Sequence, residues 1–314
     1  MKAIVCTGYG APEVLQLREL QKPIPRPGEV LIKIHATAVT SSDCLVRSFN
    51  FHGAISIPVR LVLGITKPRR AVLGLVLAGQ IESIGTGVRS FKVGDQVFGF
   101  EGFAFGAYAE YKRMAESGVL ALKPSNLSYS EAAAIPYGGM LALQFLRKGT
   151  IRRGQRVLIY GASGAVGTSA VQLAKHFGAA HVTGVCSAAN LKLVRSLGAD
   201  AVIDYTKDDF TIAGERYDLI LIAVGNRVSP PSKADCEKAL MPDGAYVSVD
   251  QGRLKLLKED LILLKKLVEA GELKPVIDRS YPLEEMVDAH TYVDQGHKSG
   301  NVVITINQAA TTRS

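Results

Sequence analysis

The sequence is poor in the features that mark secreted and membrane-spanning proteins. Its four cysteines, Cys6, Cys44, Cys186 and Cys236, are widely spaced and form no CxxC pair. That spacing argues against a disulfide framework and predicts free thiols of the cytosolic kind. No uncharged apolar run reaches the roughly 18 residues that a membrane span needs, and the first residues lack the apolar core of a secretory signal. We therefore expect a soluble cytoplasmic protein with no membrane partner.

Basic charge is in excess, but it is not concentrated. The formal net charge is +8, and the lysines and arginines occur in small groups such as Lys67, Arg69 and Arg70. They lack the interleaved aromatic residues that stack on bases, so we expect no nucleic-acid partner. A solvated basic surface that attracts an anionic cofactor explains the charge better. With 314 residues and 47% hydrophobic content, the chain suffices for about two domains.

The most informative motif follows an apolar run at Val157–Tyr160. A glycine turn, residues 161–167 (Gly-Ala-Ser-Gly-Ala-Val-Gly), comes next and leads into a helix-like segment, Thr168–Phe177. Small residues at such a turn let the backbone approach a pyrophosphate, and the N-terminus of the helix offers free N–H groups and a partial positive charge. Because isolated glycine motifs also serve ordinary turns, the surroundings decide whether this is a dinucleotide site.

The surroundings continue the alternation of strands and helices. Apolar runs recur at residues 181–186, 201–203, 219–224 and 245–249, and a helical stretch spans Leu191–Leu197. Strands that alternate with helices predict a parallel sheet with right-handed crossovers. We therefore predict an α/β fold in which a Rossmann doubly wound sheet carries the glycine turn, and the turn is predicted to bind a dinucleotide.

The end of the second of these strands indicates which dinucleotide. An NAD site usually carries Asp or Glu about twenty residues past the glycines, where it binds the ribose hydroxyls and repels a 2′-phosphate. No acidic residue occurs here from 183 to 199. Ser187 and Asn190 can donate hydrogen bonds, Lys192 adds positive charge, and the Tyr205 hydroxyl can reach the same phosphate. These residues predict NADPH. Alternatively, Ser187 and Asn190 cap the next helix and Lys192 is simply solvated.

The N-terminal third has a different pattern. Short apolar runs, as in residues 29–36, 79–85 and 93–100, are separated by Gly and Pro. These are strand signals with turn punctuation, so residues before 124 form a strand-rich domain. The last apolar run, Asn301–Ile306, has no helix after it to continue the winding. We expect that strand to return to the first domain.

Several segments together resemble the medium-chain dehydrogenase/reductase superfamily, in order and over essentially the whole chain. They are Met1–Val5, Pro25–Lys33, Gly94–Gly99, the glycine turn and Gly296–Ile304. The resemblance implies a GroES-like β-rich catalytic domain, residues 1–124 and 256–314, into which a Rossmann NADP-binding domain, residues 125–255, is inserted. It also implies a cleft between the two, where substrate meets the nicotinamide.

The superfamily contains zinc alcohol dehydrogenases and zinc-free reductases. Catalytic zinc needs three protein ligands, usually Cys, His and a third Cys or an acid. Where the zinc branch has its first Cys, this chain has Thr40, and where that branch reads Gly-His-Glu, this chain reads Gly74-Leu75-Val76. The four-cysteine structural loop expected after Gly99 is missing as well. We therefore expect no zinc.

What remains resembles the zinc-independent quinone oxidoreductase branch, which includes the ζ-crystallins and NADPH-dependent enone reductases. Its glycine pattern is matched by the turn, and Tyr205 falls where the branch has a tyrosine near the 2′-phosphate. Asn190 stands where some members carry Lys, and Leu45 replaces a pocket tyrosine of some quinone reductases. The resemblance further implies a homodimer. From motif and resemblance, the predicted cofactor contacts are Gly161, Ser163, Gly164, Ala165, Val166, Gly167, Ser187, Asn190, Tyr205, Val224 and Asn301.

The resemblance implies hydride transfer from NADPH to a small-molecule quinone or α,β-unsaturated carbonyl. Such an acceptor spreads charge onto a distant oxygen, so the protein mainly aligns donor and acceptor and stabilises that oxygen. Candidate catalytic residues are Thr40, Asp43 and Tyr137, with Ser42 beside them. Each has a structural alternative: Ser42 and Asp43 can cap a helix starting at Cys44, and Tyr137 can pack its ring. Cys44 and Cys186 are expected to be buried, since neither has a histidine nearby in sequence.

Two other functions remain open. One is a zinc-type NAD(P) alcohol dehydrogenase, which would oxidise alcohols when zinc is supplied. The other is a non-enzymatic NADPH-binding protein, crystallin-like or RNA-associated, which would bind NADPH tightly without turnover. Turnover on quinones, alkenals and enones separates the reductase from both.

Overall fold

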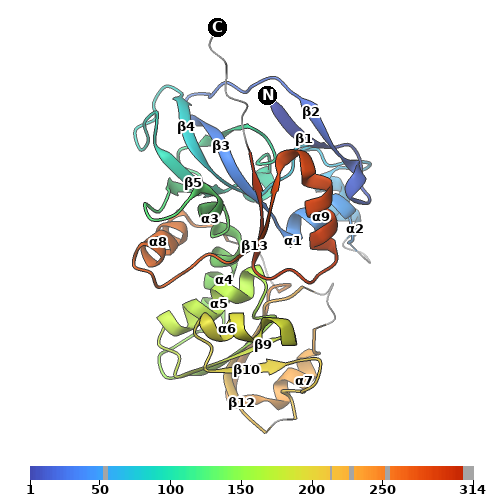
Figure 1. Ribbon diagram of the computed structural model, residues 1–314, viewed down its shortest axis with the longest axis vertical. Coiled ribbons are helices and arrows are strands. Elements are labelled where there is room, and N and C mark those ends of the chain that lie inside the picture. The colour runs from blue at the N-terminus through green and yellow to red at the C-terminus, as the bar shows by residue number, and fades with distance from the viewer. Residues whose placement is uncertain (52–55, 213, 226–229, 252–254, 307–314) are drawn as a thin grey trace. The chain divides into compact units, whose positions relative to one another are not determined.

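A computed structural model describes residues 1–51, 56–212, 214–225, 230–251 and 255–306 (Figure 1). Two compact units divide the chain. Unit 1 comprises Met1–Pro136, Leu257–Ile262 and Ile277–Ser314, and unit 2 comprises Tyr137–Leu256 and Leu263–Val276. The inserted domain expected at residues 125–255 overlaps unit 2 from Tyr137 onward, and its limits stay a prediction.

Unit 1 is built on a seven-stranded sheet with the order β13-β14-β3-β4-β5-β7, in which β6 also pairs with β3. These strands are β3 (Glu29–Val39), β4 (Val76–Ile84), β5 (Gln96–Phe100), β6 (Tyr111–Ala115), β7 (Leu120–Leu122), β13 (Ile277–Pro282) and β14 (Asn301–Thr305). A separate hairpin pairs β1 (Lys2–Cys6) with β2 (Leu15–Glu19). The helices of this unit are α1 (Ser41–Ser48), α2 (Ser56–Leu63), α3 (Tyr129–Ala133) and α9 (Met286–Asp294), and α8 (Lys258–Glu269) contributes residues to both units.

The apolar runs of the N-terminal third form strands, as predicted. The run at 29–36 lies in β3, the run at 79–85 in β4 and the run at 93–100 in β5. The return of the last strand is also confirmed, because β14 pairs antiparallel with β3 and places Val302 opposite Val39. In the sheet of unit 1, β3 therefore pairs with a strand more than 250 residues distant in sequence.

Unit 2 contains a five-stranded parallel sheet with the order β10-β9-β8-β11-β12. Its strands are β8 (Arg156–Tyr160), β9 (His181–Cys186), β10 (Ala201–Asp204), β11 (Tyr217–Ile222) and β12 (Leu240–Ser248). Its helices are α4 (Pro136–Lys148), α5 (Ala165–His176), α6 (Leu191–Ser196) and α7 (Lys233–Lys238). The strands run outward from β8 in both directions, first to β9 and then back to β11, so the order reverses beside β8. In doubly wound sheets ligands bind at that reversal, at the carboxyl ends of the strands.

The predicted α/β fold is confirmed. The central strands of unit 2 are buried along their length, as at Leu158, Val185 and Ile220, which belong to one hydrophobic core with Phe210. Parallel strands covered on both faces read as continuous apolar runs, which is why the sequence revealed them. The expected helix at Thr168–Phe177 begins three residues earlier, at Ala165, so the glycine turn is shorter than its sequence pattern.

All four cysteines are buried free thiols, as expected for a chain without close cysteine pairs. None of the helices among the described residues is both long and apolar enough to span a membrane.

Candidate functional site

The glycine turn connects β8 to α5 at the point where the strand order reverses. Gly161 has a φ of +79°, and a Cβ built on it would lie 2.2 Å from Cγ1 of Val224. The predicted contact residue Val224, just after β11, therefore lies against the turn. Both the positive φ and the close approach require glycine at position 161.

The other two glycines of the turn differ in what surrounds them. A Cβ on Gly167 would lie 2.1 Å from the carbonyl oxygen of Gly161, whereas a Cβ on Gly164 would meet only that same oxygen, at 3.6 Å. Gly167 is therefore needed for packing α5 against the turn. Gly164 is needed only if another molecule approaches the backbone at that point. It is also the N-cap of α5, where no side chain supplies a capping hydrogen bond.

These features fit a dinucleotide pyrophosphate. The first amides of a helix have no carbonyl partner inside the helix and carry partial positive charge. At α5 those amides belong to the predicted contact residues Ala165, Val166 and Gly167, while Ser163 and Gly164 are half-buried at the mouth of the turn. Small residues and an open N-cap provide the space and the donors that a bound phosphate needs.

Tyr137 lies close to this turn. It is in the first turn of α4 and is 7% exposed. A Cβ on its neighbour Gly138 would lie 2.2 Å from the carbonyl oxygen of Ala165. The start of α4 and the start of α5 are therefore in backbone contact, which only glycine at 138 permits. The structure thus brings Tyr137, a residue predicted to contact substrate, beside the predicted cofactor turn.

The predicted 2′-phosphate residues also come together. The backbone N–H of Tyr205 donates to the carbonyl of Cys186 at 3.2 Å, which places Tyr205 next to Ser187 at the adjoining strand ends. Asn190 Nδ2 donates to Ser187 Oγ at 3.2 Å. Tyr205 is exposed, and its ring centroid lies 6.1 Å from that of Tyr160. Lys192 is exposed on α6.

The alternative role of Ser187 and Asn190 as helix caps is wrong. Ser187 is the N-cap residue of a short 3₁₀ turn and Asn190 that of α6, yet neither side chain makes a capping hydrogen bond. Asn190 has an αR backbone with ψ of 0° instead of the extended conformation usual at an N-cap. The 3₁₀ turn leads directly into α6, so α6 begins at Leu191 without a polar side chain to cap it.

Sequence reasoning missed an acidic residue near this site. Asp204 ends β10 in register with Cys186 of β9, and it is 6% exposed. Its Oδ1 accepts hydrogen bonds from the Thr206 hydroxyl at 2.8 Å and the Thr206 amide at 3.1 Å. The hydroxyl bond, above all, lowers the pKa of Asp204. The carboxylate closes its own turn after β10, a role that a search limited to the end of β9 does not reveal.

Thr40 and Asp43 form a capping box at the start of α1. Thr40 is the N-cap, and its hydroxyl accepts from the Asp43 amide at 3.1 Å, while Asp43 Oδ2 accepts from the Thr40 amide at 3.0 Å. Asp43 Oδ2 also accepts from the Thr40 hydroxyl at 2.7 Å, and Oδ1 accepts from the Gly74 amide at 3.1 Å. The helix therefore begins at Ser41 and not at Cys44, and Thr40 is its N-cap residue in place of Ser42 or Asp43.

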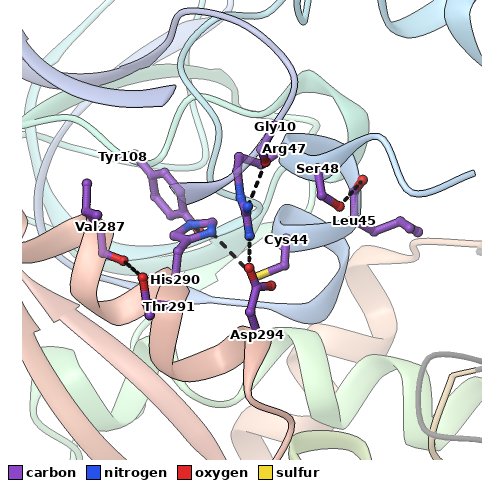
Figure 2. A network of polar contacts seen from close by, with 10 residues as sticks. All are labelled: Gly10, Cys44, Leu45, Arg47, Ser48, Tyr108, Val287, His290, Thr291 and Asp294. Atoms are coloured by element: carbon purple, nitrogen blue, oxygen red, sulfur yellow. Dashed lines mark hydrogen bonds and ion pairs between the residues drawn. The ribbon is translucent and has the colours of Figure 1, made fainter. Parts of the chain in front are cut away.

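A chain of buried polar contacts extends from Asp43 into unit 1. The Tyr108 hydroxyl hydrogen-bonds Asp43. His290 Nε2 lies 3.2 Å from that hydroxyl, and His290 Nδ1 lies 3.4 Å from Cys44 Sγ; Figure 2 shows Tyr108, His290 and Cys44. Thr40 is 3% exposed and the other four residues are fully buried. We call Thr40, Asp43, Cys44, Tyr108 and His290 the polar corner. Its residues come from α1, a loop before β6, and α9.

The polar corner corrects the expectation that Cys44 has no histidine near it. Cys44 is buried, as expected, but the absence of a nearby histidine in sequence does not hold in space, because α9 brings His290 beside it. Burial lowers the pKa of His290 to about 3, so the imidazole is neutral. In the arrangement that uses every donor, the Cys44 thiol donates to His290 Nδ1, His290 Nε2 donates to Tyr108 and Tyr108 donates to Asp43.

Burial also acts on the acid of the corner. It raises the pKa of Asp43 to about 6, against the lowering effect of the hydrogen bonds from Thr40, Gly74 and Tyr108. Next to the corner, Arg47 is 1% exposed; it donates to the Gly10 carbonyl at 2.7 Å and forms an ion pair with Asp294 (Figure 2). Its charge further lowers the pKa of His290.

Asn301 completes the set of predicted cofactor contacts. Asn301 is the first residue of β14 in unit 1 and is 5% exposed. Thr40 and Leu75, which stand where zinc ligands would be, are both buried. Among the described residues, no three of His, Cys, Asp and Glu gather in a way that could hold a metal ion.

Comparisons with known proteins place the chain in a family. The family model of the alcohol dehydrogenase GroES-like domain matches residues 26–124, and models of zinc-binding dehydrogenases match residues 165–267 and 252–304. Two relatives span most of the chain. They are 2-methylene-furan-3-one reductase of Solanum lycopersicum, 35% identical over 97% of this chain and 79% of its own length, and the chloroplastic NADPH-dependent alkenal/one oxidoreductase of Arabidopsis thaliana, 33% identical over the same shares.

A solved structure agrees with the sequence relatives. The quinone oxidoreductase from Coxiella burnetii superposes with a TM-score of 0.82 at 30% identity, covering 98% of this chain and 99% of its own. The likeness therefore extends over both units, each of which also carries its own family match. The chain belongs to the medium-chain dehydrogenase/reductase superfamily, in its quinone oxidoreductase branch.

Proposed function

We propose that this protein is an NADPH-dependent oxidoreductase that reduces quinones or α,β-unsaturated carbonyls without catalytic zinc. The observation that carries the proposal is the turn at residues 161–167, where Gly164 leaves the backbone open beside the start of α5, a helix without a side-chain cap. The backbone amides of Ala165, Val166 and Gly167 would hold the pyrophosphate. The relatives named as alkenal/one and furanone reductases support the acceptor class.

We propose NADPH over NADH from the ends of β9 and β10. Ser187, Asn190 and the exposed Tyr205 lie together there and supply neutral hydrogen-bond donors for a 2′-phosphate, with the Lys192 charge on the following helix. The nearby carboxylate of Asp204 is engaged with Thr206. The end of β9, where NAD sites place the acid that binds both ribose hydroxyls, carries no Asp or Glu.

We propose Tyr137 as the group that binds the acceptor's oxygen. When bound, NADPH supplies a hydride from C4 of its nicotinamide. The reduced acceptor gathers negative charge on its oxygen, and a hydroxyl held in place by α4 can donate a hydrogen bond to it. Gly138 keeps the start of α4 in contact with Ala165, which fixes Tyr137 relative to the cofactor turn. Proton delivery to carbon can then come from solvent.

Thr40 and Asp43 have a different proposed role. The Thr40 hydroxyl donates its proton to Asp43, and the carboxylate of Asp43 accepts from four donors in unit 1. We propose that the two residues position the corner between β3 and α1, and that the remaining lone pair of the Thr40 hydroxyl faces the substrate. Asn301, at the start of β14, is proposed as a further cofactor contact.

Steady-state assays test the proposal directly. Oxidation of NADPH is followed at 340 nm with a panel of quinones, alkenals, enones and simple ketones, each repeated with NADH and after dialysis against EDTA. We expect turnover on the unsaturated acceptors, a higher kcat/KM with NADPH than with NADH, and no loss with EDTA.

The same panel separates the alternatives. The match to zinc-binding dehydrogenase models supports the zinc alcohol dehydrogenase as the second candidate. Alcohol oxidation that requires added zinc, together with inactivity on enones, would establish that activity and overturn our proposal. Tight NADPH binding with no turnover on any acceptor would instead indicate a non-enzymatic binding protein.

The cytoplasmic location and the homodimer stay predictions, and related proteins carry chloroplastic and mitochondrial names. Analytical ultracentrifugation tests the homodimer.

A further inference from the structure

The helix α2 has an unusual distribution of apolar residues. Its sequence, residues 56–63, reads Ser-Ile-Pro-Val-Arg-Leu-Val-Leu, with apolar side chains on every side, yet none of its residues is buried. A helix that is hydrophobic all round normally lies in a protein core or in contact with lipid. This helix therefore presents apolar surface that the described residues of unit 1 do not bury.

The outward face of α2 forms a continuous apolar stripe. Ile57, Leu61 and Val62 are 68%, 61% and 72% exposed, and Ile65, just past the helix end, is 63% exposed. At 3.6 residues per turn, Ile57, Leu61 and Val62 share the broad outer side of α2, and Ile65 follows beyond the helix end. Val59 and Leu63, on the opposite side, are half-buried, so the helix is seated on unit 1 with these apolar residues facing out.

Specific contacts hold α2 in this orientation. Arg60 lies over the Phe49 ring, 4.2 Å from its centroid, and donates to the Ile65 carbonyl at 2.5 Å. The Tyr9 hydroxyl donates to the Gly64 carbonyl at 2.9 Å, and Arg69 donates to the Leu61 carbonyl at 3.0 Å. The outward stripe is thus a fixed feature of the fold and not a consequence of a loose turn.

Positive charge lies beside the stripe, where Arg69 contacts the Leu61 carbonyl. The sequence has no Asp or Glu between Asp43 and Glu82, whereas Lys67, Arg69 and Arg70 follow the helix and are exposed. Arg70 also lies within electrostatic reach of Glu101, but that carboxylate is paired with Lys112 at 3.2 Å. The surface therefore combines four outward apolar side chains with a cationic border.

We propose that residues 56–70, which we call the α2 surface, dock on an anionic lipid bilayer, with Ile57, Leu61, Val62 and Ile65 entering the interface. Apolar side chains gain by entering the boundary between headgroups and acyl chains, and lysines and arginines beside them are attracted to anionic headgroups. Docking of this kind spans no membrane. It departs from the sequence expectation that no membrane is a partner, because net hydropathy does not show which apolar residues the fold leaves outside.

Charge also distinguishes the bilayer from a second copy of the chain. A symmetric contact through the α2 surface would bring the cations of the two copies together, since a two-fold interface uses the same patch on both sides. Like charges at such a contact oppose association. An anionic bilayer matches both the apolar stripe and its cationic border.

Vesicle sedimentation tests the proposal on the full chain. Wild-type protein is mixed with vesicles of phosphatidylcholine alone or of phosphatidylcholine with about a third phosphatidylserine, at low salt and in 0.5 M NaCl. We expect binding to the anionic vesicles to be at least ~10-fold tighter, with part of it surviving salt because the apolar contribution is not screened. Binding to neither vesicle overturns the proposal.

Matched variants assign the binding to the α2 surface. The triple change Ile57→Ser, Leu61→Ser and Val62→Ser is expected to weaken binding to anionic vesicles ~10-fold or more. The control triple Ile24→Ser, Val93→Ser and Ile212→Ser alters side chains of similar exposure and is expected to change it less than ~2-fold. Equal losses in the two triples would mean that the α2 surface is not the docking site. Equal NADPH affinity in all proteins shows that they are folded.

A single fluorescent reporter gives a second measurement. The chain contains no tryptophan, so Leu61→Trp introduces the only one. Its emission is expected to shift to shorter wavelength on anionic vesicles, and that of a control Ile24→Trp is not. An unshifted Leu61→Trp emission overturns the proposal. If the Ser triple keeps its vesicle binding but loses self-association, the stripe binds a second copy of the chain instead. If the triple keeps its vesicle binding but has a raised substrate KM, the stripe contacts substrate instead.

Discussion

The glycine turn of unit 2 and the polar corner of unit 1 are both helix N-termini, but they are built in opposite ways. At the turn, the start of α5 has no capping side chain and Gly164 leaves its backbone open. At the corner, Thr40 and Asp43 cap α1 with both their side chains and are buried. An open N-terminus can hold a ligand, whereas a closed one spends its donors on the fold. Changes at the two sites should therefore affect different properties.

The largest effect is expected on stability at the polar corner. Asp43→Ala leaves the Thr40 and Gly74 amides and the Tyr108 hydroxyl without their acceptor in a buried site. We expect the free energy of unfolding to fall by about 3 kcal/mol, measured by urea titration, with NADPH affinity of the folded protein unchanged. As a control, Asp209→Ala removes an exposed carboxylate with two similar bonds to Thr211 and should cost under about 1 kcal/mol. A large loss of NADPH affinity in Asp43→Ala would remove the contrast between the sites.

The converse effect is expected at the glycine turn. Gly164→Val adds a side chain where the protein leaves space, so thermal stability should change little. The same side chain would block the approach of a pyrophosphate, and we expect the Kd for NADPH to rise about 100-fold. Fluorescence titration of NADPH measures the Kd, and a thermal melt provides the folding control. An unchanged Kd would show that the cofactor does not lie at this turn.

A smaller effect is expected from Tyr137→Phe, which keeps the ring beside the turn and removes only the hydroxyl. If that hydroxyl binds the acceptor's oxygen, kcat/KM with an enone should fall about 30-fold, with the loss in kcat. The Kd for NADPH should stay within about 2-fold. Single-turnover kinetics would measure the hydride-transfer rate itself. Full activity in this variant would mean that Tyr137 only packs against α5.

The smallest expected effect lies in the pH dependence of stability. Burial raises the pKa of Asp43 from 3.8 to about 6, so over that range the folded protein keeps a proton that the unfolded chain releases. Its contribution to stability therefore falls as pH rises. Burial lowers the pKa of His290 from 6.5 to about 3, so the unfolded chain binds a proton there that the folded protein lacks, and its contribution rises with pH.

These two contributions oppose each other in the wild type. Asp43→Asn removes the Asp43 contribution and keeps that of His290. As pH rises from 3.8 to about 6, the free energy of unfolding of the variant should therefore rise by at least about 1 kcal/mol relative to that of the wild type. Urea titrations of both proteins at several pH values measure the difference. Parallel pH profiles would show that Asp43 does not titrate as the polar corner requires.

Much of unit 2 was predictable because its determinants are local. Continuous apolar runs identified β8, β9, β10 and β11, and the spacing of glycines identified the turn, since a positive φ and close backbone approach tolerate little else. The grouping of Ser187, Asn190 and Tyr205 was also foreseen, because parallel strands end at one edge of the sheet. The sequence did not reveal that Ser187 and Asn190 leave their helix starts uncapped.

The polar corner was predictable only in part. Thr40 and Asp43 were singled out, but a cap was expected only of Asp43 and its neighbour Ser42, and the start of α1 was placed three residues too late. His290 and Tyr108 could not be assigned to the corner, because they lie 247 and 65 residues from Asp43 and nothing in their local sequence marks them. The exposed stripe on α2 was missed for a related reason: an apolar residue reads the same in sequence whether the fold buries it or turns it outward.

The sequence by itself determined the family, the α/β class and the glycine turn, because strand periodicity and backbone freedom are properties of neighbouring residues. Tertiary structure decided what the remaining polar groups do. It set α9 against α1, which made a neutral histidine and a buried acid members of one hydrogen-bonded chain. It also left Gly164 open, while closing the corner around Asp43. Burial and hydrogen-bond partners depend on segments that meet only in the folded protein, and these fix the charge and the role of each residue.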